Sequence, residues 1–177
     1  MKVLTVLVPT YNVEKYLRRC LDSLLLPEVL EEIEVLVVND GSKDGSADIA
    51  RAYEKKYPQT VVFVDKENGG HGSTINVGIE KAQGTYFKVL DSDDWVNIGD
   101  FIEFIKRLKE ETADAVICDY RKEHVYNGKS EYFEYKDLED GKKYNLNEID
   151  LNILHGEYFM MATTTYRTEV LRASGLK

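Results

Sequence analysis

The chain has 177 residues, of which 43% are hydrophobic and 31% charged, and its formal net charge is −9. This length suits one globular, soluble domain, and no run is apolar for the roughly 20 residues that a membrane-spanning helix needs. The acidic balance argues against nucleic acid as a partner, because such interfaces collect lysine and arginine. It also makes a bound divalent cation an attractive partner for an anionic substrate.

Short apolar runs alternate with segments of helical periodicity over the first 118 residues. We expect strands at residues 4–8, 35–38, 61–64, 86–90 and 115–118. We expect helices between them, the first capped by Asn12 and ending near Pro27, and the others with apolar faces within residues 49–57, 75–82 and 101–108. This alternation predicts an α/β fold with a mainly parallel central sheet flanked by helices.

The pattern changes after Arg121. The segment Tyr126-Asn127-Gly128-Lys129 lies between strand-like runs and predicts a β-hairpin with a two-residue turn. Residues 146–154 have a helical pattern and residues 158–166 a strand-like one. Thr168 is placed to cap a short final helix that ends at Gly175.

The two cysteines are far apart in the sequence and lie in apolar surroundings. Cys20 and Cys118 lack metal-ligand spacing, so we expect buried thiols and no disulfide. The amino terminus becomes polar by residues 9–12, which is too early for a secretory signal. These features predict a cytoplasmic protein.

Polar residues follow three of the predicted strands at their carboxyl ends. They are Pro9-Thr10-Tyr11-Asn12, Asn39-Asp40-Gly41-Ser42 and Asp91-Ser92-Asp93-Asp94-Trp95. Ligands of an open parallel sheet bind beyond this edge, where the connecting loops converge. We therefore expect the three segments to surround one site.

The acidic group after the fourth strand is the most distinctive of these segments. Asp91 and Asp93 are two residues apart at a strand end, so their carboxylates can project to the same side and bind Mg²⁺ or Mn²⁺. Coordination positions would remain for substrate phosphates. The alternative is a helix cap, which Asp94 or Asp100 could provide for a helix that begins near Ile98.

Two other loops give weaker signals. Asp40 can accept hydrogen bonds from a base or a sugar ring, or it can belong to an ordinary turn. Residues 68–73 resemble an anion-binding loop before a helix, although they lack the spacing of a P-loop. Within that loop, His71 is expected to be a solvated side chain.

Taken in order, these segments resemble the family 2 glycosyltransferases, whose nucleotide-binding domain has the GT-A fold. The matching residues are 6–12, 37–46, 68–70, 76–79, 82–86 and 90–95. The resemblance covers about the first 120 residues. It implies a nucleotide-sugar-binding subdomain at residues 1–120. Residues 121–177 would be the start of an acceptor-side region that is incomplete at its carboxyl end. Both parts would belong to the same compact domain.

The resemblance also implies roles for the candidate residues. Asp40 would hydrogen-bond the base, usually uracil. Asp91 would lie near the ribose and the metal, and Asp93 would be the direct metal ligand that bridges to the diphosphate. Trp95 would lie near the acceptor or donor sugar, with packing in the core as the alternative. The residues implied to line the nucleotide pocket are Pro9, Thr10 and Tyr11.

The implied reaction is metal-dependent transfer of a sugar from a nucleoside diphosphate sugar, UDP-linked in most cases, to an acceptor hydroxyl with inversion. Mn²⁺ or Mg²⁺ would be the cofactor, and Asp91 and Asp93 the catalytic residues. The acceptor would be a glycan, a lipid-linked glycan or a wall polymer. A sugar-phosphate nucleotidyltransferase is a poorer match, because its glycine-rich amino-terminal loop with an arginine does not occur here.

The sequence departs from the family in two places. Ile75 stands where family members often have arginine, so phosphate neutralisation is expected to depend more on the metal. The family's catalytic base follows a segment like Tyr166–Leu171, so we expect the base beyond Lys177, in a region that could also contact the membrane peripherally. The alternative function is a noncatalytic module that binds a nucleotide sugar, or a partner chain through the hairpin after Arg121.

Overall fold

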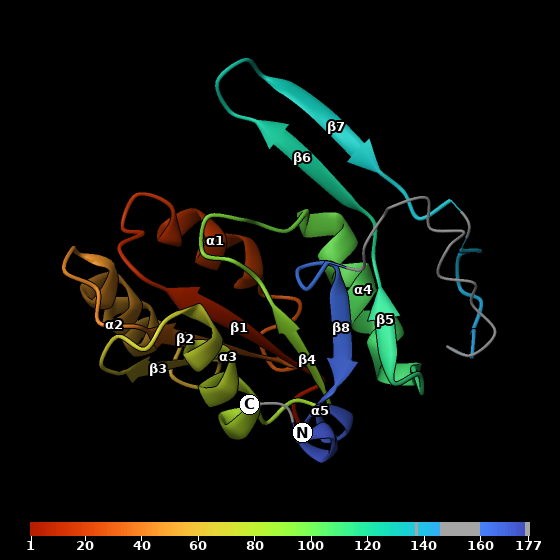
Figure 1. Cartoon of the computed structure of the whole chain (residues 1–177), viewed down its shortest axis with the longest axis horizontal. Helices are drawn as coiled ribbons and strands as arrows, with labels where there is room; N and C mark the ends of the chain where they lie inside the picture. Colours follow the sequence, from red (N-terminus) through yellow and green to blue (C-terminus); the bar gives the residue numbers. More distant parts are fainter. Residues whose placement is uncertain (137, 146–159, 176–177) are drawn as a thin grey trace.

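The computed structural model describes residues 1–136, 138–145 and 160–175, and strands and helices alternate along its first 117 residues (Figure 1). The elements are β1 (Leu4–Thr10), α1 (Leu17–Leu24), β2 (Ile33–Asn39), α2 (Ser46–Lys56), β3 (Val61–Asp65), α3 (His71–Lys81), β4 (Tyr86–Val89), α4 (Ile98–Glu110), β5 (Ala115–Ile117), β6 (Tyr120–His124), β7 (Lys129–Phe133), β8 (Thr164–Arg167) and α5 (Thr168–Ser174). The predicted α/β class is confirmed.

The central sheet has the strand order β3-β2-β1-β4-β8-β5. The first four strands of this order are parallel, and β1 is in register with both neighbours, since Leu4 lies opposite Ile33 and Tyr86. Strand β8 runs antiparallel between β4 and β5. The second part of the chain thus supplies a strand to the main sheet, while the functional division at residue 120 remains a prediction.

Helices cover both faces of the sheet. Helices α1, α2 and α4 pack on one face against side chains such as Leu4, Val6 and Val8. Helices α3 and α5 pack on the other face, against Leu7 and Phe87 among others. Every residue of β1 and β2 is buried, and the two strands are mainly apolar, with Thr5 and Glu34 as polar exceptions near their amino ends. Because the strands are parallel, their carboxyl ends meet at one edge.

The predicted cap of the first helix is wrong. Asn12 has a φ of +53°, and α1 begins five residues later, at Leu17. The Asn12 Oδ1 instead accepts a hydrogen bond from the Lys43 N–H at 2.8 Å. Asparagine tolerates this left-handed conformation better than most residues, and here it joins the loop after β1 to the loop after β2.

Two further cap predictions are corrected. Helix α4 begins at Ile98 as predicted, but its cap is Asn97, whose side chain accepts from the Asp100 N–H, and neither Asp94 nor Asp100 caps it. Thr168 is the first residue of α5 and makes no cap. Its hydroxyl donates to the Gly84 carbonyl at 2.6 Å, whereas Gly175 ends the helix with a φ of +67° as predicted.

The predicted hairpin exists as a separate two-stranded sheet that extends away from the main body (Figure 1). His124 pairs with Lys129, so the connecting loop has four residues and the prediction of a two-residue turn is wrong. Asn127 and Gly128 are the last two loop residues, and Gly128 has the positive φ that this closure needs. The predicted helix at residues 146–154 lies outside the described residues.

Both cysteines are free thiols. Cys20 is buried, whereas Cys118 is only partly so. Among the helices of the described residues, none is both long and apolar enough to cross a bilayer.

The Glu111 carboxylate closes the end of α4 and gives the fold a dependence on pH. It accepts from the N–H groups of Thr112 and Ala113 and from the Lys143 ammonium at 2.7 Å. The Lys143 contact, followed by the Ala113 N–H, lowers the pKa of Glu111 to about 2. Because the folded pKa lies below the unfolded one, the stabilisation is complete above about pH 4.5 and is lost as the pH falls toward 2.

We therefore expect Glu111→Gln to lower the free energy of unfolding by roughly 1–2 kcal/mol at pH 7 and by much less at pH 2. Urea unfolding at the two pH values measures this difference. The neighbouring exposed Glu110→Gln is the control, and an equal loss in both variants would contradict the assignment.

Candidate functional site

A cleft of about 480 Å³ opens at the carboxyl edge of the parallel strands. It is lined by Tyr11, Gly41, Lys43, Asp65, Lys66, Glu67 and Asn68. The predicted loops after the first and second strands do meet here. The cleft also includes residues 65–67 at the end of β3, and Asn68, the first residue of the predicted anion-binding loop. Residues 65–67 were not predicted, although the rule about strand ends would have selected them.

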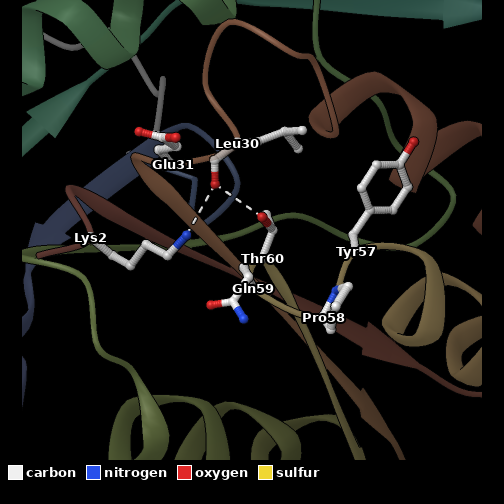
Figure 2. Close-up of a pocket in the computed structure, with 7 residues that line it drawn as sticks. All are labelled: Lys2, Leu30, Glu31, Tyr57, Pro58, Gln59 and Thr60. Atoms are coloured by element: carbon white, nitrogen blue, oxygen red, sulfur yellow. Dashed lines mark hydrogen bonds between the residues drawn. The ribbon is translucent and has the colours of Figure 1, made fainter.

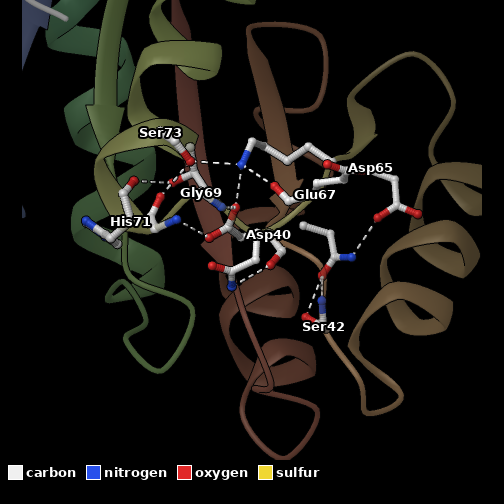
Figure 3. Close-up of polar contacts among 12 residues, drawn as sticks. Asp40, Ser42, Asp65, Glu67, Gly69, His71 and Ser73 are labelled. Carbon is white, nitrogen blue, oxygen red and sulfur yellow. Dashed lines mark hydrogen bonds and ion pairs between the residues drawn. The ribbon is translucent and has the colours of Figure 1, made fainter.

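Asp40 is the most constrained side chain at this edge. Its Oδ1 accepts from the Lys66 ammonium at 2.5 Å and from the Gly69 N–H at 2.9 Å, and its Oδ2 accepts from the Gly70 N–H at 2.8 Å. Figure 3 shows these contacts converging on the carboxylate. Asp40, which follows the last residue of β2, therefore connects this strand to the loop between β3 and α3 through hydrogen bonds.

These contacts keep Asp40 ionised. Burial by itself would raise its pKa, because a buried carboxylate loses hydration. The hydrogen bond from Lys66 and those from the Gly69 and Gly70 N–H groups favour the charged form, and together they hold the pKa of Asp40 below its usual value. The predicted anion-binding loop thus does hold an anion through its backbone, and that anion is a side chain of the same protein.

Asp91 and Asp93 lie in a turn after β4. The Asp94 N–H donates to the Asp91 carbonyl at 2.9 Å, so the segment does not continue as an extended strand and the argument from strand alternation is wrong. The charges of both carboxylates nevertheless act on the neighbouring Asp94. Burial, followed by the charges of Asp93 and Asp91, raises the pKa of Asp94.

His71 connects the acidic turn to the Asp40 loop. It begins α3, and its Nε2 lies 3.2 Å from Oδ1 of Asp91, so the prediction of a solvated loop side chain missed this contact. Gly69, Gly70 and His71 are consecutive residues. One three-residue segment therefore contacts Asp40 through its backbone and Asp91 through a side chain, although neither aspartate is among the residues that line the cleft.

The chemistry of the acidic turn fits Mn²⁺ or Mg²⁺. These ions prefer oxygen ligands, and Mg²⁺ is typically held by one or two carboxylates together with substrate phosphates. Asp91 and Asp93 supply such oxygens, and a cation would offset their negative charges, which add to the effect of burial in raising the pKa of Asp94. Across the described ranges, no three His, Cys, Asp or Glu side chains gather closely enough to hold an ion by themselves.

The first loop contributes mainly Tyr11. Pro9 and Thr10 are buried at the end of β1, and the Thr10 hydroxyl donates to the Val8 carbonyl at 3.1 Å. Tyr11 is half exposed and lines the cleft. Of the three residues implied to line the pocket, Tyr11 is the one that the cleft includes.

Trp95 and Ile75 take different positions. Trp95 is partly exposed and outside the two core clusters, and the Arg19 guanidinium lies over its ring, 3.2 Å from the centroid. The alternative that Trp95 packs in the core is therefore wrong, and its role toward a sugar remains a prediction. Ile75 belongs to α3 and packs against the core between this helix and the sheet, so its side chain faces the sheet.

A second cavity, of about 470 Å³, lies near the amino ends of β1 and β3 (Figure 2). Its polar groups are used internally, since the Lys2 ammonium and the Thr60 hydroxyl both donate to the Leu30 carbonyl at 3.0 Å. None of the predicted site residues lines it. The candidate site is therefore the cleft at the carboxyl edge.

The sequence pattern of the family described as glycosyl transferase family 2 matches residues 5–170. The chain belongs to this family. The resemblance drawn from the motifs is thereby confirmed.

This family 2 chain is similar to curated bacterial proteins. It is 41% identical over 126 residues to the putative glycosyltransferase EpsH of Bacillus subtilis (strain 168), covering 71% of the chain and 36% of EpsH. It is 41% identical over 98 residues to the minor teichoic acid biosynthesis protein GgaB of the same organism, covering 55% of the chain and 11% of GgaB.

The fold is shared with solved structures of the family. The crystal structure of S. aureus TarS residues 1–349 matches with a TM-score of 0.77 at 28% identity, covering 98% of the chain and 49% of TarS 1–349. The same TarS fragment has been solved with UDP and with UDP-GlcNAc. These matches confirm the GT-A fold, and the chain spans about half or less of the length of each of these proteins.

Proposed function

We propose that the chain binds a nucleoside diphosphate sugar, with UDP as the nucleotide, and forms the donor side of an enzyme that transfers the sugar to an acceptor hydroxyl with inversion. The main support for this proposal is that residues 69–71 contact both Asp40 and Asp91. A nucleotide in the neighbouring cleft would have its base near Asp40 and its diphosphate near the acidic turn.

The base would lie beside Tyr11 and donate a hydrogen bond to the Asp40 carboxylate. Tyr11 offers an exposed aromatic ring, and Asp40 offers an ionised carboxylate. Pro9 and Thr10 would support this wall from the end of β1. Family membership and the UDP complexes of TarS support the choice of nucleotide.

Asp93 and Asp91 would hold Mn²⁺ or Mg²⁺, and His71 would orient the Asp91 carboxylate through the contact at 3.2 Å. When bound, the ion neutralises charge on the diphosphate leaving group. The chain's own contribution is to fix these carboxylates in a turn closed by a backbone hydrogen bond.

We propose a glycan, lipid-linked or wall-polymer acceptor, and the name of GgaB, a teichoic acid biosynthesis protein, favours the wall polymer. The proton of the acceptor hydroxyl would be removed by a carboxylate of the acceptor side. A cytoplasmic site is consistent with the two free thiols.

Calorimetry with UDP and Mn²⁺ tests the donor site. We expect wild-type binding, and we expect Asp93→Asn to weaken it by about ten- to a hundredfold, because a contact with a charged group contributes about 1.5–3 kcal/mol. Asp48→Asn is the matched control, since Asp48 is an exposed aspartate on α2. No binding by the wild type, or equal binding by Asp93→Asn, would refute the proposal.

The hairpin favours a second candidate, a noncatalytic module that also docks a partner chain. At its tip, Val125 is largely exposed and Tyr126 fully exposed, although both are large hydrophobic residues. Nucleotide binding without transfer, in a protein that includes the acceptor-side region, would support this candidate over the enzyme.

A further inference from the structure

The Asp40 carboxylate has few acceptor positions left for a ligand. An ionised carboxylate accepts about four hydrogen bonds, two at each oxygen. Lys66 and Gly69 take both positions at Oδ1, and Gly70 takes one at Oδ2. The side chain is only 4% exposed, and one acceptor position is left, at Oδ2, for a ligand beside Gly41 and Lys66, which line the cleft.

Lys66 is held in the position that produces this arrangement. Its ammonium has three N–H donors, and three oxygens lie within reach: Asp40 Oδ1, the Glu67 carbonyl at 2.6 Å and the Ser73 hydroxyl at 2.9 Å. The Ser73 hydroxyl in turn donates to the Gly70 carbonyl at 2.7 Å. Because all three N–H groups are used, the Lys66 ammonium has no donor left for a base. It can affect a base only through the acceptor position that it takes on Asp40 Oδ1.

We propose that Lys66 determines the nucleobase specificity of the cleft by leaving Asp40 one acceptor position. This inference rests on the proposed function. Uracil and thymine present one N–H donor, at N3, between two carbonyl groups, and one acceptor position satisfies it. Guanine presents adjacent donors at N1 and N2, which pair with a carboxylate through one position on each oxygen, and Oδ1 has none free.

Cytosine is disfavoured for a different reason. Its N3 carries a lone pair instead of a hydrogen, so a cytosine in the placement of uracil would repel the open lone pair of Asp40 Oδ2. Its N4 amino group can donate to that position only if the ring shifts away from the placement of uracil. The expected order of affinity is UDP and TDP first, with CDP and GDP weaker. Lys66 is thus a positioning residue, because it acts on the base through Asp40.

Calorimetry with UDP, TDP, CDP and GDP in the presence of Mn²⁺ tests this order. For the wild type we expect GDP to bind at least about tenfold more weakly than UDP, because one N–H of guanine loses its partner. Lys66→Met vacates one position at Oδ1 and should reduce the ratio of the GDP to the UDP dissociation constant by about tenfold. Lys55→Met, an exposed lysine on α2, should keep the wild-type ratio.

The outcomes separate this inference from the proposed function. Equal binding of GDP and UDP by the wild type would overturn the inference and leave nucleotide binding in place, and this result needs no variant to fold. An unchanged ratio in a folded Lys66→Met, as judged by circular dichroism, would also overturn it. If no nucleoside diphosphate binds the wild type, the proposed function fails.

Discussion

Replacing Gly84 with alanine is expected to lower the free energy of unfolding by more than about 3 kcal/mol. A Cβ at this position would lie 2.3 Å from the Thr5 N and 2.6 Å from the Leu4 carbonyl carbon. These atoms belong to the backbone of β1 at the centre of the sheet, so they cannot move aside as a flexible side chain would. For a chain of this length, the loss corresponds to a fall in Tm of about 6–12 °C.

Gly72→Ala is the matched control for thermal unfolding. Gly72 lies in α3, and a Cβ there would meet no atom within 4 Å. Since alanine favours helix over glycine, we expect stability to be unchanged or to rise by up to about 1 kcal/mol. Similar melting temperatures for the two variants would show that the close approach of Gly84 to β1 is not real.

Asp40→Ala is expected to destabilise the fold by about 3 kcal/mol at pH 7. The substitution leaves the partly buried ammonium of Lys66 without its counter-charge and the Gly69 and Gly70 N–H groups without their acceptor. The loop before α3 would lose its attachment to β2. Urea unfolding measures the effect, and we also expect UDP binding to be lost.

The same variant predicts a dependence on pH. The folded pKa of Asp40 lies below its unfolded value, so its stabilisation is present above about pH 4 and is lost as the pH falls through the folded pKa. The difference between wild type and Asp40→Ala should therefore shrink in acid. The control, Asp48→Ala, removes an exposed carboxylate and should cost less than about 1 kcal/mol at either pH. A constant difference for Asp40→Ala down to pH 2 would contradict the assignment.

The sequence by itself determined the fold class and the edge of the sheet that carries the site. Buried parallel strands appear as uninterrupted apolar runs, and the helices between them show as apolar stripes, so β1 to β4 were predicted with small errors at their ends. The polar segments at residues 9–12, 39–42 and 91–95 were predicted to share one edge, because parallel strands bring their carboxyl ends together.

Tertiary structure alone decided the contacts within that edge. The insertion of β8 between β4 and β5 depends on pairing between segments far apart in the chain, which local periodicity does not encode. The occupation of Asp40 by Lys66 and the approach of His71 to Asp91 depend on how the loops cross after the strands end. Hydrogen bonds of this kind are made by whichever donors the folded backbone brings within about 3 Å, and residue type and spacing do not specify that distance.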